Sequence, residues 1–230
     1  MNETTMIKKS WWKILSVILL LYTFIVGLLI KIPYVGNLYE TIRNLFFHVP
    51  MWFGMMILFV VSFVYSIGFL RKPSFKADIY STEYAKMGVV FGLLGLITGA
   101  IWANYTWGEP WSNDPKQLGA AIAILIYAAY FVLRNSIPDM DKRAKVAAVY
   151  NIFAFAMLFP TLWIMPRMVE SLHPGGQGAE GNPGMNGSDL DPNMRMVFWP
   201  AVIGWTLLAV WIATLKIRLA LLKEKRLSNV

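Results

Sequence analysis

The chain has 230 residues, of which 57% are hydrophobic and only 15% are charged, and its mean hydropathy is +0.52. This balance excludes an ordinary soluble domain and favours an all-α protein that crosses a membrane several times. The net charge is +8, and cysteine is absent. Without cysteine the chain can form no disulfide and can supply no thiolate for redox or metal chemistry.

Six apolar segments predict six transmembrane helices within a single domain, residues 1–230. A helix needs about 20 residues, each rising about 1.5 Å, to cross a hydrocarbon core ~30 Å thick. Five segments meet this length, and the fourth is short, so its ends are expected close to the membrane interfaces. The predicted spans are residues 11–30, 45–70, 84–104, 118–133, 146–166 and 197–215.

The first segment has the basic start of a signal peptide, with Lys8, Lys9 and Lys13. Its apolar run is too long for the core of a signal peptide, and no small-residue cleavage site precedes Lys31. We therefore expect a retained first span.

The basic residues predict the orientation of the six spans. If the N-terminus is inside, 16 of the 21 basic residues lie on the inner side. Because cytoplasmic loops are enriched in Lys and Arg, both termini are predicted to be cytoplasmic. This topology accounts for the positive net charge without a nucleic-acid partner. The basic residues left on the outer side are Lys31, Arg43, Lys116, Arg167 and Arg195.

The larger connections all lie on the predicted outer side, where we expect the function to reside. One is a tryptophan-rich loop at residues 105–117. Another, at residues 167–196, contains "HPGGQGAEGNPGMNGSD", which is rich in Gly, Pro, Asn and Ser. Such a composition predicts a flexible loop.

The only two histidines are predicted to lie at the same membrane depth on the outer side. His48 lies in "NLFFHVPMWFG" and His173 in "VESLHPGG". Either one alone would be read as a polar residue at the membrane interface. Together they predict a shared site, because imidazole is a common ligand of iron, copper and zinc. Two imidazoles make a poor zinc site, whereas they would complete the coordination of a haem iron.

The loop sequence "YTWGEPWSNDPK" carries Trp107 and Trp111 in a turn-rich backbone. Tryptophan is enriched at membrane interfaces, which explains part of this pattern. Gly108 and two prolines favour a fixed turn, and a rigid aromatic surface suits a flat apolar macrocycle. Asp114 precedes a proline and could equally cap the next helix. The outer cations available for propionates include Arg43 and Lys116.

These residues resemble a known family. "TWGEPWSNDPK" is similar to the tryptophan-rich WWD motif of haem-handling proteins in cytochrome c biogenesis, and "FFHVP" and "SLH" resemble the two histidine segments of its CcmC members. The order of histidine, tryptophan-rich loop and histidine matches as well, over nearly the whole chain. The family has tryptophan directly before the aspartate, where this chain has Asn113. Tyr105 is an aromatic residue that could replace the missing contact.

The resemblance implies that haem b is held transiently at the outer surface and presented to the haem chaperone CcmE. It implies that CcmD and the CcmAB transporter are further partners, and that the location is a bacterial inner membrane with the loops facing the periplasm. It implies no enzymatic activity. By resemblance, His48 and His173 are the axial iron ligands, and haem contacts are carried by Trp107, Gly108, Trp111 and Asp114.

Three alternatives remain open. A haem–cytochrome c ligase of the CcsA or CcmF kind shares the motif but is larger, with additional histidines. A membrane electron-transfer cytochrome usually holds haem between helices inside the membrane, whereas both histidines here are predicted at helix ends or in a loop. A secondary transporter would be expected to carry ionisable residues deep in its spans, which are nearly absent here.

Overall fold

The computed structural model describes residues 10–33, 36–173 and 190–227, and within these residues every regular element is a helix. Six of the helices are long and apolar enough to cross a membrane, which confirms the predicted all-α membrane architecture. Six is an even number of crossings, so the two described ends of the chain, residues 10 and 227, lie on the same side of the membrane. The six helices are α2 (Trp11–Leu29), α3 (Leu45–Arg71), α4 (Phe75–Trp107), α5 (Pro115–Asn135), α6 (Met140–Leu158) and α8 (Pro192–Leu227).

Several helices extend beyond the apolar segments that predict them. Helix α4 begins at Phe75 because the Ser74 side chain caps it, accepting a hydrogen bond from the backbone N–H of Ala77 at 3.2 Å. Helix α5 has 21 residues, so the fourth segment is not short. Hydropathy marks the part of a helix that lies in hydrocarbon, whereas polar caps set its ends. The tryptophan-rich loop is thereby reduced to residues 108–114.

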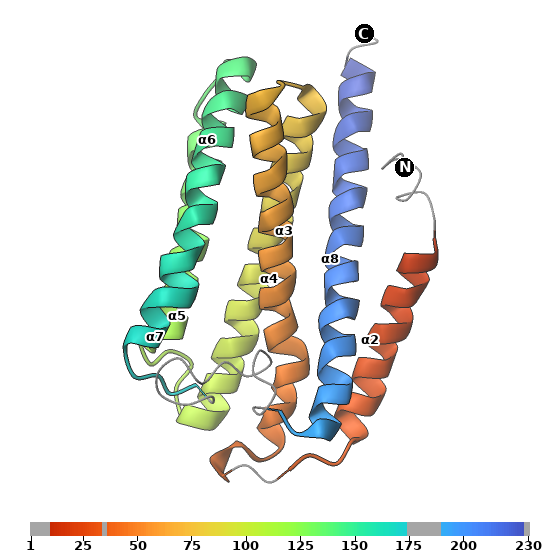
Figure 1. Ribbon diagram of the computed structural model, residues 1–230, viewed down its shortest axis with the longest axis vertical. Helices are drawn as coiled ribbons and strands as arrows, with labels where there is room; N and C mark the ends of the chain where they lie inside the picture. Colours follow the sequence, from red (N-terminus) through yellow and green to blue (C-terminus); the bar gives the residue numbers. More distant parts are fainter. Residues whose placement is uncertain (1–9, 34–35, 174–189, 228–230) are drawn as a thin grey trace.

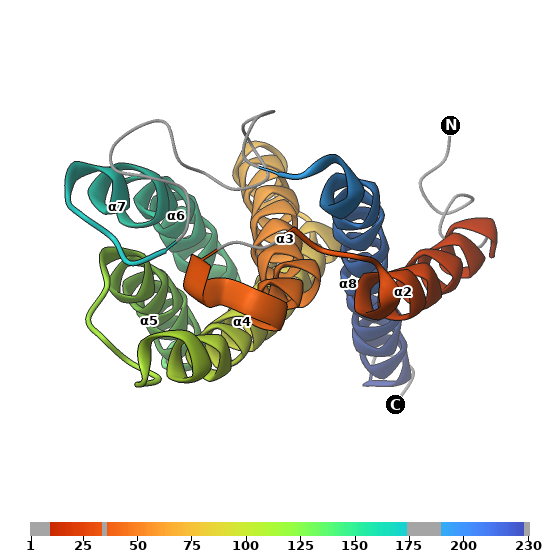
Figure 2. The same ribbon diagram turned by 90° about the horizontal axis from the view of Figure 1, so that it is seen from below.

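The helices form three neighbouring pairs. Figures 1 and 2 show α3 and α4 in the middle, with α5 and α6 on one side and α2 and α8 on the other. Helix α2 packs against α8 through small residues, and the Ser16 hydroxyl donates to the Gly204 carbonyl at 3.0 Å. Small residues let membrane helices approach closely.

A buried polar cluster joins α3, α4 and α6 in the middle of the bundle. The Asn151 side-chain amide donates to the hydroxyls of Ser62 and Ser66 at 2.7 and 2.8 Å, and to that of Ser81 at 3.1 Å. Because hydrocarbon offers no other partners, such contacts hold membrane helices together, typically with about 0.6 kcal/mol each.

Short helices cover one end of the bundle. Element η1 (Gly36–Asn44) lies across the ends of α3 and α4 (Figure 2). At the end of α6, a π-helical segment, η2 (Phe159–Ile164), leads into α7 (Met165–Met168). The chain then runs through residues 169–173 along the same end. The predicted flexibility of the 167–196 loop concerns residues 174–189, which lie outside the described residues.

Candidate functional site

The two histidines lie at the same end of the bundle. His48 is in the first turn of α3, which starts at the lower end of Figure 1. His173 follows α7, in the segment that crosses this end in Figure 2. Both imidazoles lie against the same part of α4, His48 at Gly99 and His173 at Trp102 and Trp107. Residues 125 positions apart are therefore brought into one region by the folding of α3, α4 and α7.

Two glycines of α4 make room for the side chains around His48. A methyl group at Gly99 would lie 2.7 Å from Cε1 of His48, and one at Gly95 would lie 2.8 Å from the indole of Trp52. His48 and Trp52 are four residues apart on α3, as Gly95 and Gly99 are on α4. The ring of His48 therefore packs on Gly99 and that of Trp52 on Gly95. Small residues at this spacing allow the close packing of the two helices.

The hydrogen bonds of His48 define which of its nitrogens carries the proton. Thr98 Oγ1 donates its single hydrogen to the Leu94 carbonyl at 2.7 Å. It must therefore accept at its 3.1 Å contact with His48 Nδ1, so Nδ1 carries the hydrogen. Nε2 then holds a lone pair, which accepts from the indole N–H of Trp52 at 3.3 Å.

His173 is oriented by a carboxylate. Its Nδ1 lies 2.9 Å from Oδ1 of Asp114, and its backbone N–H donates to the Ser171 hydroxyl. The other oxygen of Asp114 accepts from the Ser171 hydroxyl at 2.9 Å and from the Leu172 backbone N–H at 2.7 Å. Asp114 thus holds the whole 171–173 segment against the tryptophan-rich loop.

Asp114 also caps α5, accepting from the backbone N–H of Lys116 at 2.9 Å. Burial alone would raise its pKa. The hydrogen bond and charge of His173, with the donors Leu172 and Lys116, outweigh burial and hold the pKa of Asp114 well below its usual range. The carboxylate is therefore ionised at neutral pH, and an ionised carboxylate can only accept hydrogen bonds. His173 Nδ1 must donate, which leaves the lone pair on Nε2.

Two tryptophans connect the histidines. Trp107 packs edge-on against His173 with ring centroids 4.9 Å apart, and Trp102 lies 6.1 Å from the same imidazole. Trp102 is one turn along α4 from Gly99, on which His48 lies. His48 and His173 therefore contact neighbouring turns of α4, His48 at Gly99 and His173 at Trp102 and Trp107.

The rest of the loop presents Trp111 at the surface. Gly108 ends α4 with φ +87°, a conformation that favours glycine, and Asn113 has φ +56°. Asn113 accepts a hydrogen bond from the Trp111 indole N–H at 2.8 Å. The Gln117 side-chain oxygen accepts from the Ser112 backbone N–H at 3.0 Å and fixes the loop to α5. Trp111 is 40% exposed, whereas Trp107 faces His173, so the two loop tryptophans differ in surroundings.

The two predicted cations occupy different settings. The Arg43 guanidinium donates to the carbonyls of Gly27 and Ile30 at 2.8 Å each and pairs with Glu40. It thus satisfies carbonyl groups at the end of α2, where helical partners are missing. Lys116 is half-buried at the start of α5, next to Asp114. Of the two, Lys116 is the one placed beside the histidine site.

Sequence reasoning missed several residues that shape this site. In the sequence, Trp52 is explained by the general enrichment of tryptophan at membrane interfaces, and Thr98, Gln117 and Ser171 gave no signal. The spacing of Trp52 from His48, and of Gly99 from Gly95, is one helical turn and could have indicated paired faces. The polar contacts of the other three depend on tertiary structure.

The arrangement suits the ligation of a metal that accepts two imidazoles. Both rings have Nδ1–H bonded to an acceptor, so both carry the lone pair that can bind a metal on Nε2, although that of His48 accepts from Trp52 here. An orienting partner on the second nitrogen is the usual arrangement for metal-binding histidine. Within the described ranges no group of three or more His, Asp or Glu residues could hold a bare metal ion.

Comparison with known proteins supports the resemblance seen in the sequence. A family model for CcmC, described as heme exporter protein C, matches residues 2–230. Heme exporter protein C of Bradyrhizobium diazoefficiens is 27% identical over 186 residues, which are 80% of this chain and 68% of that protein.

Cytochrome c biogenesis proteins CcsA match a smaller part. The CcsA of Prochlorococcus marinus subsp. pastoris is 38% identical over 106 residues, which are 44% of this chain and 34% of that protein. The CcsA of Thermosynechococcus vestitus is 43% identical over 92 residues, 39% of this chain and 28% of that protein. The shared part is thus about a third of each CcsA protein. The chain belongs to the heme exporter protein C (CcmC) family, and is a multi-pass membrane protein of the Ccm system with a role in haem handling for cytochrome c biogenesis.

Proposed function

We propose that this protein binds haem b between His48 and His173, at the outer surface of the membrane that it spans, and presents the haem to the chaperone CcmE. The observation that carries the proposal is that both imidazoles have Nδ1–H fixed by an acceptor, Thr98 or Asp114, and keep Nε2 for iron. Iron held by two imidazoles in a porphyrin has six ligands, so such haem is six-coordinate.

The surroundings of the histidines fit the rest of a haem. Trp102 and Trp107 supply aromatic surface beside His173. The exposed indole of Trp111 can stack on the face or edge of a macrocycle that reaches the surface. Lys116 is the cation placed to pair with a propionate, while Arg43 would first have to leave the carbonyls of α2.

Trp52 competes with iron for the same lone pair of His48. Its indole N–H donates to Nε2, so ligation requires Trp52 to move. Trp52→Phe keeps an aromatic ring on Gly95 and removes this donor. A net hydrogen bond contributes about 0.5–1.5 kcal/mol, so haem should bind roughly 2- to 12-fold more tightly to this variant in a spectral titration. Trp102→Phe is the control. The indole of Trp102 does not donate to Nε2 of His48, so this variant should show no increase in haem affinity. Unchanged or weaker binding by Trp52→Phe would refute the competition.

The transfer step tests the proposed function directly. Haem-loaded protein mixed with purified CcmE should yield CcmE that carries the haem. Trp111→Ala should bind haem roughly two- to tenfold less tightly, from about 0.5–1.5 kcal/mol of lost stacking, and should transfer it more slowly still.

Trp199→Ala is the matched control, because Trp199 is 42% exposed at the same end of the bundle. It should leave both binding and transfer intact. Normal transfer by Trp111→Ala would remove the loop from the exchange, and absence of transfer by the wild type would reject the proposed function.

The location and orientation follow from the basic residues. We propose a bacterial inner membrane, with both termini in the cytoplasm and the histidine site facing the periplasm. Because the chain has no cysteine, single cysteines report topology without background. Glu109→Cys, beside the tryptophan-rich loop, should react with an impermeant thiol reagent in intact cells. Ser136→Cys, between α5 and α6, should react only after lysis. The reverse labelling would invert the orientation.

Family membership also suggests further partners and a role in haem binding and release. CcmD and the CcmAB transporter are proposed as neighbours of this chain in the Ccm system. We propose that the chain itself binds and releases haem without catalysing a reaction. Ligation at helix ends, in the same loop region as the exposed Trp111, suits cargo that must leave and favours this role over an electron-transfer cytochrome. A steady reductant-linked turnover by the purified protein would contradict it.

A further inference from the structure

A cavity of about 870 Å³ lies at the opposite end of the bundle from the histidines. Its walls are the end of α3, the start of α4, the end of α5, the start of α6 and the last part of α8. This volume falls in the range of roughly 300–1,000 Å³ that is usual for small-molecule sites. The cavity has no part in the haem site described above.

Two ion pairs neutralise the carboxylates of the α4 wall. The Arg134 guanidinium donates to both oxygens of Asp78 at 2.7 and 2.6 Å, and Lys86 pairs with Glu83 at 2.5 Å. The paired Arg134 and Asp78 side chains are only 12% and 15% exposed. This wall is therefore fixed and nearly neutral, and it does not repel an anion.

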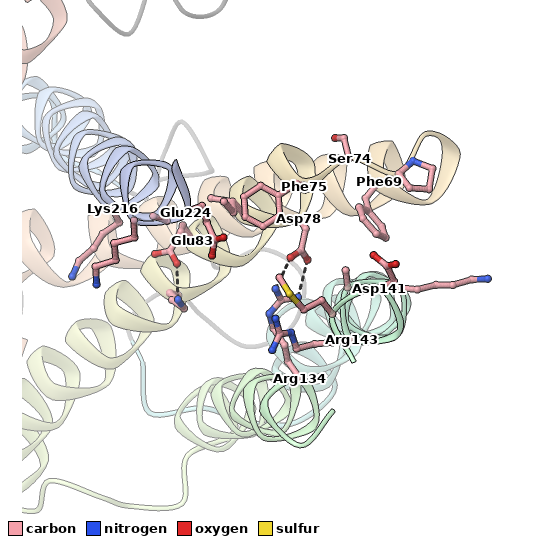
Figure 3. Close-up of a pocket in the computed structure, with 18 of the residues that line it drawn as sticks. Phe69, Ser74, Phe75, Asp78, Glu83, Arg134, Asp141, Arg143, Lys216 and Glu224 are labelled. Atoms are coloured by element: carbon pink, nitrogen blue, oxygen red, sulfur yellow. Dashed lines mark hydrogen bonds and ion pairs between the residues drawn. The ribbon is translucent and has the colours of Figure 1, made fainter. Parts of the chain in front are cut away.

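The charges that remain are mainly cations on two facing walls. Arg143 and Lys145 come from α6, and Lys216 and Lys223 come from α8. None of these four forms an ion pair with a residue that the structure describes. Figure 3 shows Arg143 beside Arg134 on one side of the α4 carboxylates and Lys216 on the other. The unpaired carboxylates that line the cavity, Asp141 and Glu224, leave a surplus of positive charge.

Apolar side chains of α3 continue from the cavity toward the middle of the membrane. Leu70 is 37% exposed and lines the cavity, and Val64 and Val60, 57% and 42% exposed, lie farther from the end of α3. A ligand that fits has an anionic group for the cations and hydrocarbon for these surfaces. A phospholipid has this combination, and basic pockets between transmembrane helices are known to hold anionic headgroups.

We propose that this cavity binds an anionic phospholipid, with its phosphate between the cations of α6 and α8 and its acyl chains along the apolar wall. The bound lipid neutralises cations that otherwise face one another across the opening. It also fills the space between α6 and α8, which the protein itself leaves open. The site is independent of the proposed haem function.

Native mass spectrometry of the detergent-purified protein tests this proposal, with phosphatidylglycerol and phosphatidylcholine added separately. Phosphatidylglycerol should remain bound, and the double variant Arg143→Gln, Lys216→Gln should weaken it at least about fivefold. The control Lys76→Gln, Lys142→Gln removes the same charge at the same end from exposed residues that do not line the cavity, and should change binding by less than about twofold. Far-ultraviolet circular dichroism establishes that both variants fold.

Equal binding of phosphatidylcholine, or equal loss in the two double variants, would overturn the proposal by showing unspecific lipid contact. Inorganic phosphate at millimolar concentration should not displace phosphatidylglycerol, because it lacks the apolar part. Full displacement by phosphate would overturn the lipid as occupant and identify a free phosphate compound instead.

Discussion

Alanine in place of either His48 or His173 should convert the bound haem from six-coordinate low-spin to five-coordinate. Each ring offers Nε2 and has its other nitrogen fixed, so each variant loses one axial ligand. Loss of an orienting partner alone typically weakens metal binding about 10- to 100-fold, and loss of the ligand should exceed this. The double variant should lose nearly all haem. Absorption spectra during haem titration measure both effects.

Added imidazole provides the internal control for the histidine variants. It should restore the low-spin spectrum of each single variant, because it fills the vacated axial position. It should restore the double variant only at much higher concentration, since two free ligands must then be ordered. Wild-type spectra for both single variants would contradict axial ligation by these residues.

Asp114→Asn should reduce haem affinity by roughly 10- to 100-fold, the range expected for a residue that orients a ligand. The carboxylate accepts from four donors, and an amide has only one oxygen. If the amide nitrogen takes the place of Oδ1, the backbone N–H of Lys116 loses its acceptor, and the imidazole must accept at Nδ1 and carry its hydrogen on Nε2, where it cannot bind iron. If the nitrogen turns toward Leu172, that backbone N–H loses its acceptor and the 171–173 segment loses its fixed position.

Two substitutions separate the capping role of Asp114 from its role in orienting His173. Asparagine caps a helix about as well as aspartate, whereas alanine costs typically about 1 kcal/mol. With its amide oxygen on the N–H of Lys116 and its nitrogen toward Leu172, Asp114→Asn should therefore keep the thermal stability of the apoprotein while losing haem, and Asp114→Ala should lose both. If Asp114→Asn binds haem as the wild type does and only Asp114→Ala is impaired, the residue acts as a helix cap alone.

The sequence predicts the architecture better than the details of the site. The six helices follow from apolar length, because hydrocarbon requires each span to satisfy its own backbone. The common end of His48 and His173 follows from counting spans. The helix ends did not follow from apolar length, since capping by Ser74 and Asp114 extends α4 and α5 beyond their apolar parts. Hydropathy contains no information on such caps.

The competing roles of Asp114 show why the site needs the structure. From sequence, capping of α5 and a functional contact were equal alternatives, and the geometry shows that one carboxylate makes both contacts. Similarly, Trp107 and Trp111 share one motif, yet one packs on His173 and the other is exposed. The hydrogen bond of Trp52 to His48 depends on the approach of α3 to Gly95 and Gly99, and the sequence shows only the one-turn spacing within each pair.

Electron–nuclear double resonance on the ferric haem-loaded protein, grown with ¹⁵N-histidine and purified without a histidine tag, tests the central claim most directly. The chain contains two histidines, so every histidine signal arises from His48 or His173. Ligation by both predicts strong coupling of the iron spin to two ¹⁵N nuclei, and to one in His48→Ala. Coupling to a single histidine nitrogen, or to none, in the wild-type protein would contradict the account.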